Sequence, residues 1–323
     1  MKLALIGYGN VGRAFARLLL RQHPRFSFPI TGIHTAHHGT AIDENGLAGN
    51  PRFGPPAASV EQFLESAGAD VAVEITPLNP VTGEPAISHI RAAFRRGMHV
   101  ITANKGPIAH AYGSLRDEAE QCGVELRFEA TVMDGAPVFN LVRYSLPAVK
   151  VLGFTGVLNS TTKIVIEAMR EGHSMEEAIA LAQRLGVAET DVRFDIDGWD
   201  SAAKTAALAN VLMDARVTPQ EVDTRGIARL TPERLAELGS KGKTVRLVSR
   251  ARRTAGGIRL RVRAEVMDQT DLLAAVYGTS NLLLLHTDLM GTVGTLSVSP
   301  SLEQTAYGLF SDLLNLSARD LAS

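Results

Sequence analysis

Short apolar runs alternate with amphipathic stretches along the first part of the chain. Residues 2–7 form a short run that is apolar after Lys2 and ends in glycine, as a buried parallel strand does. Apolar positions at helical spacing follow from Val11 to Leu19 and stop before Pro24. The repeat of this alternation predicts an α/β fold, a Rossmann-type doubly wound parallel sheet with crossover helices. Further strands are expected at residues 29–34, 71–76, 99–102 and 125–131, and helices at 60–66, 87–96 and 110–121.

The pattern changes after Asp134. A strand over residues 151–158 leads into a series of helices, and two antiparallel strands are expected on either side of Gly256-Gly257. These features predict a second domain of the α+β class. We expect a dinucleotide-binding domain at residues 1–134, a substrate and dimerisation domain at 135–300, and a C-terminal helix at 301–323 that can return to the first domain. The helices of the second domain are expected at residues 162–170, 175–185 and 200–212, with a polar loop over 186–199.

The segment Gly7-Tyr8-Gly9-Asn10-Val11-Gly12 lies between the first strand and the first helix. In a dinucleotide-binding loop the first glycine permits a tight turn, the second admits the pyrophosphate, and the third packs helix against strand. The helix N-terminus beyond it offers free N–H groups to phosphate. Three glycines can also form an ordinary loop, but the strand–loop–helix context favours a dinucleotide site.

The end of the second predicted strand bears on the choice of dinucleotide. An Asp or Glu at this point usually binds the 2′-hydroxyl of NAD. Residues 32–35 contain no acid, and His37 and His38 follow. These histidines are either solvated loop residues or neighbours of a 2′-phosphate. The missing acid favours NADP over NAD.

Composition excludes several functional classes. The net charge of −1 provides no basic excess for nucleic acid or an anionic membrane. The N-terminal apolar run is too short for a signal peptide, and no stretch approaches the length of a membrane span. The one cysteine, Cys122, excludes an internal disulfide, fits a reducing compartment and is expected to be a packing residue. We therefore expect a cytoplasmic protein.

Two polar features are candidates for chemistry. Carboxylates cluster between Glu189 and Asp200, and Lys204 lies one helical turn after Asp200. A solvated acidic loop with a surface ion pair explains this cluster equally simply. Lys105 follows a predicted parallel strand, where ligands bind in open α/β sheets, although a lysine in a surface turn is the plain alternative.

Four blocks of the sequence, together with the glycine loop, resemble the homoserine dehydrogenase family. They are TANKGPIA at residues 102–109, EATVMDGAPVF at 129–139, GVLNSTT at 156–162 and AQRLGVAETDVRFDIDGWDSAAK at 182–204. The blocks occur in the family's order, and the last is the most specific. The resemblance covers about residues 1–310 and weakens after residue 215.

The resemblance implies hydride transfer between NAD(P) and the pair homoserine and aspartate semialdehyde, in the threonine and methionine pathway. It implies that Lys204 and Lys105 flank the reacting oxygen and that Lys204 shuttles its proton. A neighbouring cation and partial burial lower the pKa of a lysine toward a useful range. The positions matching substrate-binding residues are Glu189, Asp195, Asp200 and Thr161. The positions matching cofactor-binding residues are Thr76, Asn104, Lys105 and Gly186, besides the glycine loop.

The resemblance also implies a monovalent cation such as sodium, bound largely through backbone oxygens. The matching positions are Glu129, Val132, Asp134 and Ala136, although an ordinary turn before Pro137 is the alternative. A homodimer built through the sheet of the second domain is implied as well. The leucines at residues 282–285 are compatible with such a contact.

Three departures from the family pattern leave the substrate open. Ser160 stands where the family has the glycine of Asn-Gly-Thr, Val187 replaces a tyrosine, and Ser299-Pro300-Ser301 replaces Gly-Ala-Gly. The alternatives are therefore a related oxidoreductase for another small amino or hydroxy acid, and an inactive NAD(P)-binding sensor. Retention of both lysines argues against the sensor. The chain has no room for a regulatory module after residue 323, so feedback inhibition by threonine is not expected.

Overall fold

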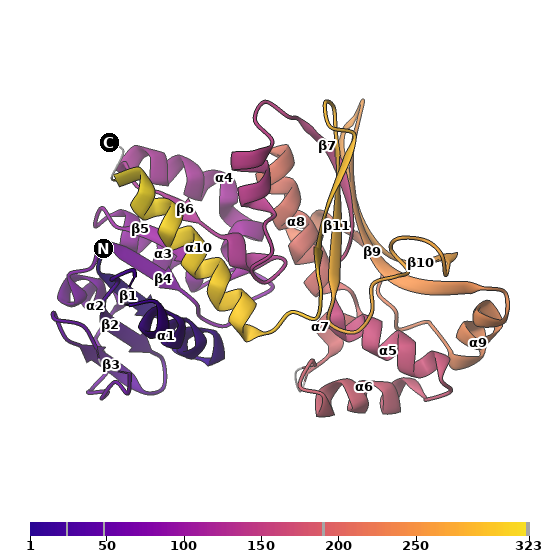
Figure 1. Cartoon of the computed structure of the whole chain (residues 1–323), viewed down its shortest axis with the longest axis horizontal. Helices are drawn as coiled ribbons and strands as arrows, with labels where there is room; N and C mark the ends of the chain where they lie inside the picture. The colour runs from indigo at the N-terminus through magenta and orange to yellow at the C-terminus, as the bar shows by residue number, and fades with distance from the viewer. Residues whose placement is uncertain (24, 48, 189–190, 321–323) are drawn as a thin grey trace. The chain divides into compact units, whose positions relative to one another are not determined.

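The computed structural model describes residues 1–23, 25–47, 49–188 and 191–320 of the chain. They fall into two units, Met1–Asn140 with Ser301–Ser323, and Leu141–Pro300 (Figure 1). The first unit extends past the expected boundary at residue 134, because Glu129 holds the backbone of Val138, Phe139 and Asn140. Among the described residues no helix is both long and apolar enough to cross a membrane.

The sheet of the first unit has the strand order β3-β2-β1-β4-β5-β6. Every pairing from β2 to β6 is parallel, and β3 joins β2 as an antiparallel hairpin. All residues of β1 and β4 are buried, which is why both are apolar or small apart from Glu74 at the end of β4. The predicted doubly wound parallel sheet is confirmed. The strands are β1 Leu3–Ile6, β2 Ile30–Thr35, β3 Gly39–Ile42, β4 Val71–Glu74, β5 His99–Thr102 and β6 Leu126–Arg127.

Amphipathic helices cover this sheet. α1 buries Phe15, Leu18 and Leu19, and these side chains pack with Leu309 and Leu313 of the C-terminal helix α10 in one core cluster. Figure 1 shows α10, in yellow, beside α1. The helical elements of this unit are α1 Asn10–Gln22, α2 Val60–Ala67, α3 Ala86–Phe94, α4 Lys105–Cys122, the 3₁₀ turn η1 Glu129–Thr131 and α10 Leu302–Asp320.

The second unit is built on a mixed sheet with the order β12-β11-β7-β9-β10-β8. The long β9–β10 hairpin turns at the glycines expected from the sequence, with Gly257 at φ +117°. In β11 the side chains of Leu282, Leu283 and Leu285 are buried inside this unit. The strands are β7 Val151–Val157, β8 Asp223–Thr224, β9 Lys243–Thr254, β10 Gly257–Asp268, β11 Asn281–Thr287 and β12 Thr292–Ser297.

Helices of the second unit pack on this sheet, and α8 contacts β7, β9 and β10. Small residues let α8 approach closely, since Ala202, Ala203, Ala206 and Ala207 are all buried. The helical elements are η2 Leu141–Ser145, α5 Ser160–Arg170, α6 Met175–Arg184, α7 Arg193–Ile196, α8 Trp199–Met213, η3 Pro219–Glu221 and α9 Pro232–Ser240.

Several local predictions were wrong. The strand expected at residues 125–131 pairs only over Leu126–Arg127, and the chain then turns into η1. The fourth helix begins at Lys105 rather than near residue 110, because Asn104 caps it and Pro107 is tolerated in a first turn. The loop expected at 186–199 contains α7. Cys122, expected to be a packing residue, is exposed.

Candidate active site

The glycine loop joins β1 to α1 as expected. Gly7 has φ +102°, and a Cβ there would lie 2.6 Å from the carbonyl oxygen of Ile75. A Cβ on Gly12 would lie 2.9 Å from the Cδ1 of the same isoleucine, which directly follows β4. The absence of a side chain at Gly12 therefore lets α1 pack closely against the end of this strand. Gly9 faces open space, with no heavy atom within 4 Å of a built Cβ. It precedes α1 and provides no side-chain cap, which suits an anion at the helix N-terminus.

These environments predict different effects for two alanine substitutions. Gly7→Ala adds a Cβ in a left-handed conformation against backbone, and we expect it to destabilise the protein by about 2–3 kcal/mol. Gly9→Ala meets no protein atom, so the melting temperature should stay within a few degrees while dinucleotide affinity falls about tenfold or more. Thermal unfolding and a fluorescence titration with NADPH measure both. Equal loss of stability in the two variants would contradict this assignment.

Polar side chains gather at the carboxyl ends of β4 and β5. Thr76 donates through its hydroxyl and its amide to the carboxylate of Glu74. Asn104 donates from Nδ2 to the carbonyl of Thr76 over 3.2 Å, and its Oδ1 accepts from the amide of Gly106. Thr102 donates to the other oxygen of Glu74. The predicted residues Thr76 and Asn104 therefore belong to one network.

Glu74 is the centre of that network, and it was not predicted. Its side chain is buried, and the Nδ1 of His89 lies 3.6 Å from one of its oxygens. The sequence contains one clue, since an acid that ends an apolar parallel strand lies where α/β sheets bind ligands. Lys105 is the first residue of α4, directly after Asn104, and is half-buried.

The candidate cation loop lies on η1 and the turn that follows it. Glu129 is 2% exposed, and its carboxylate accepts hydrogen bonds from the amides of Val138, Phe139 and Asn140. Asp134 has φ +58°, and its Oδ1 accepts from Thr305 over 3.2 Å. Val132 is buried and Ala136 closes a turn through its amide to Met133. Among the described residues no group of three His, Cys, Asp or Glu side chains is arranged to hold a metal.

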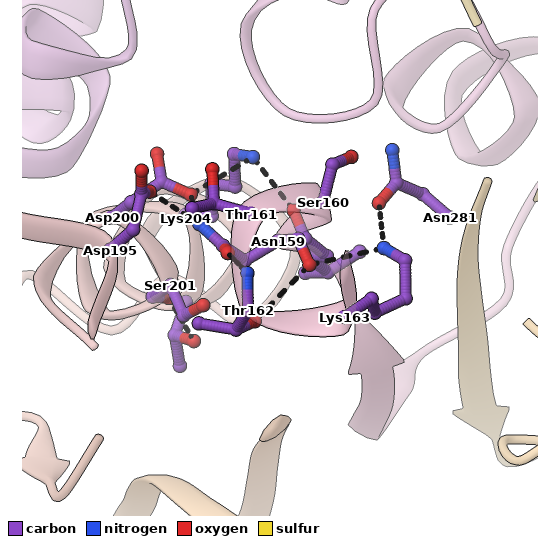
Figure 2. A network of polar contacts seen from close by, with 12 residues as sticks. Asn159, Ser160, Thr161, Thr162, Lys163, Asp195, Asp200, Ser201, Lys204 and Asn281 are labelled. Atoms are coloured by element: carbon purple, nitrogen blue, oxygen red, sulfur yellow. Dashed lines mark hydrogen bonds and ion pairs between the residues drawn. The ribbon is translucent and has the colours of Figure 1, made fainter. Parts of the chain in front are cut away.

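In the second unit, Asn159 links the expected acidic residues (Figure 2). Its Nδ2 donates to Oδ1 of Asp195 over 2.6 Å and to Oδ2 of Asp200 over 2.9 Å. Lys204 lies 3.1 Å from Asp200 Oδ2 and donates to the carbonyl of Leu158 over 2.7 Å. Asp200 and Lys204 are one turn apart on α8, while Asn159 caps the N-terminus of α5. Two segments distant in sequence, residues 158–159 and 195–204, thus converge on this cluster.

Burial sets the charge balance of this cluster. The side chains of Lys204 and Asp200 are only 15% and 14% exposed, so their ion pair is not a solvated surface pair. Burial raises the pKa of Asp195, and the neighbouring Asp200 carboxylate raises it further, whereas hydrogen bonds from Asn159 and Thr161 lower it. A cationic group entering beside Asp195 would relieve the repulsion between the two aspartates.

The remaining predicted residues are placed as follows. Thr161 is buried in the first turn of α5 and bonds Asp195 and the carbonyl of Val187. Gly186 is exposed after α6, with φ +70°. Glu189 lies outside the described residues. Lys105 belongs to the first unit and Lys204 to the second.

Two further residues of this cluster were not predicted, Asn159 and Lys163. Asn159 was noted only as part of a motif with an altered neighbour, Ser160. That neighbour donates from its hydroxyl to the carbonyl of Thr279. Lys163, in the same turn, donates to the carbonyl of Asn159 and to Asn281. A lysine on the apolar stretch of a helix was the available signal for Lys163.

Comparisons with known proteins agree on one family. A family model for homoserine dehydrogenase matches residues 137–314, and its NAD-binding domain matches residues 7–129. The NAD(+)-dependent homoserine dehydrogenase of Pseudomonas canavaninivorans is 33% identical, over 98% of this chain and 96% of that protein. The homoserine dehydrogenase of Methanocaldococcus jannaschii is 34% identical, over 98% of each chain.

Solved structures give the same answer. The crystal structure of a putative homoserine dehydrogenase from Archaeoglobus fulgidus matches with a TM-score of 0.87 and 29% identity, covering 98% of this chain and 99% of that one. The homoserine dehydrogenase of Thermoplasma acidophilum matches with a TM-score of 0.86 and 26% identity, covering 98% and 99%. These matches therefore show that the chain belongs to the homoserine dehydrogenase family, a family of NAD(P)-dependent oxidoreductases.

Proposed function

We propose that this chain interconverts L-homoserine and L-aspartate 4-semialdehyde by hydride transfer with NAD(P). One observation carries the proposal: the ammonium group of Lys204 is held between the Leu158 carbonyl and Asp200, in a cluster that also contains Asp195. Such a partly buried lysine can exchange a proton with an alcohol, while the carboxylates attract the ammonium group of an amino acid.

The glycine loop fits a dinucleotide, because Gly9 leaves open space in front of the uncapped N-terminus of α1. When bound, the dinucleotide supplies the hydride acceptor for the alcohol carbon. In its neutral amine form, Lys204 takes the proton of the hydroxyl group as the C–H bond breaks and becomes an ammonium, and the alcohol leaves as an aldehyde. In the reverse direction the same amine returns the proton to the developing alkoxide.

The acidic residues orient the substrate in this proposal. Asp195 and Asp200 bind the substrate's ammonium and hydroxyl ends, and Thr161 lines the same turn of α5. Glu189 is proposed as a further partner of the ammonium group. Lys105 is proposed as the second cation at the reacting oxygen, and Gly186 as a neighbour of the cofactor.

The test is an assay of NADPH and NADH oxidation with aspartate semialdehyde beside a panel of other semialdehydes and keto acids. We expect turnover of aspartate semialdehyde to exceed that of every other compound by at least about tenfold in kcat/KM. Turnover of another compound alone would replace the substrate while leaving the reaction class intact. The changed residues Ser160, Val187 and Pro300 make the panel necessary.

We propose that NADP is preferred, because no acid ends β2. His34, the expected position of that acid, bonds Thr40 and stacks on Phe63, and the exposed residues Ala36, His37 and His38 follow. Ala36→Asp should lower kcat/KM for NADPH relative to NADH by about tenfold, because a carboxylate repels the 2′-phosphate and binds a 2′-hydroxyl. Ala36→Asn is the neutral control. An unchanged cofactor ratio in Ala36→Asp argues against this end of β2 as the 2′-site.

Three further properties belong to the proposal. A monovalent cation such as sodium would be held by backbone carbonyls near Val132 and Ala136, because the carboxylate of Glu129 already accepts three amides. A homodimer in the cytoplasm is proposed, to be measured by sedimentation. Of the β11 leucines that the sequence offered for its contact, Leu282, Leu283 and Leu285 are buried within their own unit, and Leu284 is half-buried.

A further inference from the structure

Lys163 is a buried lysine that the proposed reaction leaves without a role. Its side chain has no solvent exposure. Its Nζ donates to the backbone carbonyl of Asn159 over 3.1 Å and to Oδ1 of Asn281 over 3.3 Å (Figure 2). An apolar side chain would fill the same space without the cost of desolvating an amine. The amine itself is therefore the feature that needs an explanation.

The contacts of Lys163 lead to Lys204, the proposed acid–base group, through two intervening residues, Asn159 and Asp200. Asn159, whose carbonyl Lys163 binds, donates to both Asp195 and Asp200. Asp200 in turn pairs with Lys204, which also binds the carbonyl of Leu158. The two lysines thus hold two consecutive backbone carbonyls, Leu158 and Asn159, where β7 passes into α5.

The same turn of α5 is fixed to the start of β11 at a second point. Ser160 donates from its hydroxyl to the carbonyl of Thr279 over 3.1 Å, two residues before Asn281. Since β7 and β11 are paired strands, this link and that of Lys163 hold the first turn of α5 in one position. The amide groups of that turn are capped by Asn159, which accepts from Thr162 over 2.8 Å.

We propose that Lys163 is a positioning residue of this site. Lys163 ties the backbone carbonyl of Asn159 to the side chain of Asn281. This contact keeps the side-chain amide of Asn159 directed at the two aspartates, and so keeps Asp200 in place for Lys204. The part of this inference that concerns turnover rests on the proposed function. A misplaced catalytic group of this kind costs up to about a hundredfold in rate.

The charge of Lys163 provides a signature that packing alone would not have. Burial lowers the pKa of Lys163 to about 7; Lys204 and Arg246 lower it, while Glu167 and Asp200 raise it. The amine is therefore protonated below about pH 7 and neutral above it. A neutral amine still has two N–H groups for its two acceptors, so the contacts persist while the charge beside Lys204 changes.

The first experiment compares Lys163→Met, which removes the donor, with Lys163→Gln, which keeps one. We expect kcat for homoserine to fall at least about tenfold in the methionine variant and less than about threefold in the glutamine variant. Dinucleotide affinity should be unchanged in both, because the glycine loop lies in the other unit. Lys241→Met, on an exposed lysine that pairs with Glu237, is the matched control and should leave kcat unchanged.

The pH profile is the second readout. In the parent protein we expect the profile of kcat to bend near pH 7, and the bend to be absent in Lys163→Gln. Asn281→Asp places a carboxylate beside the amine, which favours the charged form and should move the bend to higher pH. The chain has seven lysines, so NMR of labelled lysine side chains can follow the same titration without substrate.

Amide hydrogen exchange separates this inference from the proposed function. If the parent protein does not turn over homoserine, the proposed function fails, and exchange at Thr162 decides the inference. Acceleration of about tenfold in Lys163→Met and not in Lys241→Met supports positioning. Unchanged exchange at Thr162 overturns it, and in an active parent a kcat of Lys163→Met within twofold of the parent overturns it as well. If Lys163→Met does not fold, Asn281→Ala is measured in its place. The same results for exchange at Thr162 and for kcat then support or overturn the inference.

Discussion

Lys204→Ala is expected to lower kcat for homoserine by about a thousandfold or more, while NADPH affinity stays within about twofold of the parent. The substitution removes the amine that exchanges the alcohol proton. It leaves the glycine loop untouched, since that loop belongs to the other unit. Steady-state kinetics and a fluorescence titration of NADPH measure the two quantities separately.

Two further variants test whether Lys204 contributes proton transfer or only charge. Lys204→Arg keeps a positive charge beside Asp200 but holds its proton too tightly to exchange it, so it should be nearly as inactive as alanine. Lys243→Ala removes an exposed lysine paired with Asp268 and should behave as the parent. If Lys204→Arg retains most of the activity, the lysine contributes charge rather than proton transfer. If Lys204→Ala retains most of the activity, the assignment of Lys204 as the acid–base group is wrong.

Glu129→Ala is expected to destabilise the protein by about 4 kcal/mol, the second large effect. The carboxylate accepts from three consecutive amides, at 2.5 Å from Val138, 3.0 Å from Phe139 and 2.6 Å from Asn140, and is buried. Alanine leaves these amides without their charged acceptor, and each such bond contributes about 1.5–3 kcal/mol. Denaturant unfolding of both variant and parent gives the difference.

An exposed glutamate provides the control for that measurement. Glu303 pairs with Arg17 and Arg21 on the surface, and its side chain is 47% exposed. Glu303→Ala should therefore cost at most about 1 kcal/mol. A Glu129→Ala variant no less stable than Glu303→Ala would show that the three amides find other acceptors.

The regular part of the fold was predictable, and its exceptions have local causes. β1, β4 and β5 are short and fully or nearly fully buried, so their apolar runs identify them directly. The segment 125–131 mixes apolar and charged residues, and its pairing ends at Arg127, before Glu129 binds the amides of residues 138–140. Short elements such as β3 and α7 leave too few residues for a periodic pattern.

Some residues of the candidate site could be predicted from the sequence, and others were found only in the structure. Local motifs identified the glycine loop and the pair Asp200 and Lys204, because their chemistry depends on residues within one turn of each other. Asn159 and Glu74 were missed as hubs, since the partners that make them hubs, such as Asp195 and Thr102, lie far away in sequence. A lone asparagine or glutamate in a sequence shows nothing of such partners.

The sequence by itself therefore determined the parallel α/β sheet, the dinucleotide loop and the lysine–aspartate pair. Only the tertiary structure decided that Asn159 joins Asp195 to Asp200 and that Lys163 is buried behind it. It also decided that Leu282, Leu283 and Leu285 of β11 are buried in the second unit. The physical reason is the same in each case: local spacing fixes backbone conformation, whereas burial and hydrogen bonding depend on which distant segments the fold brings together.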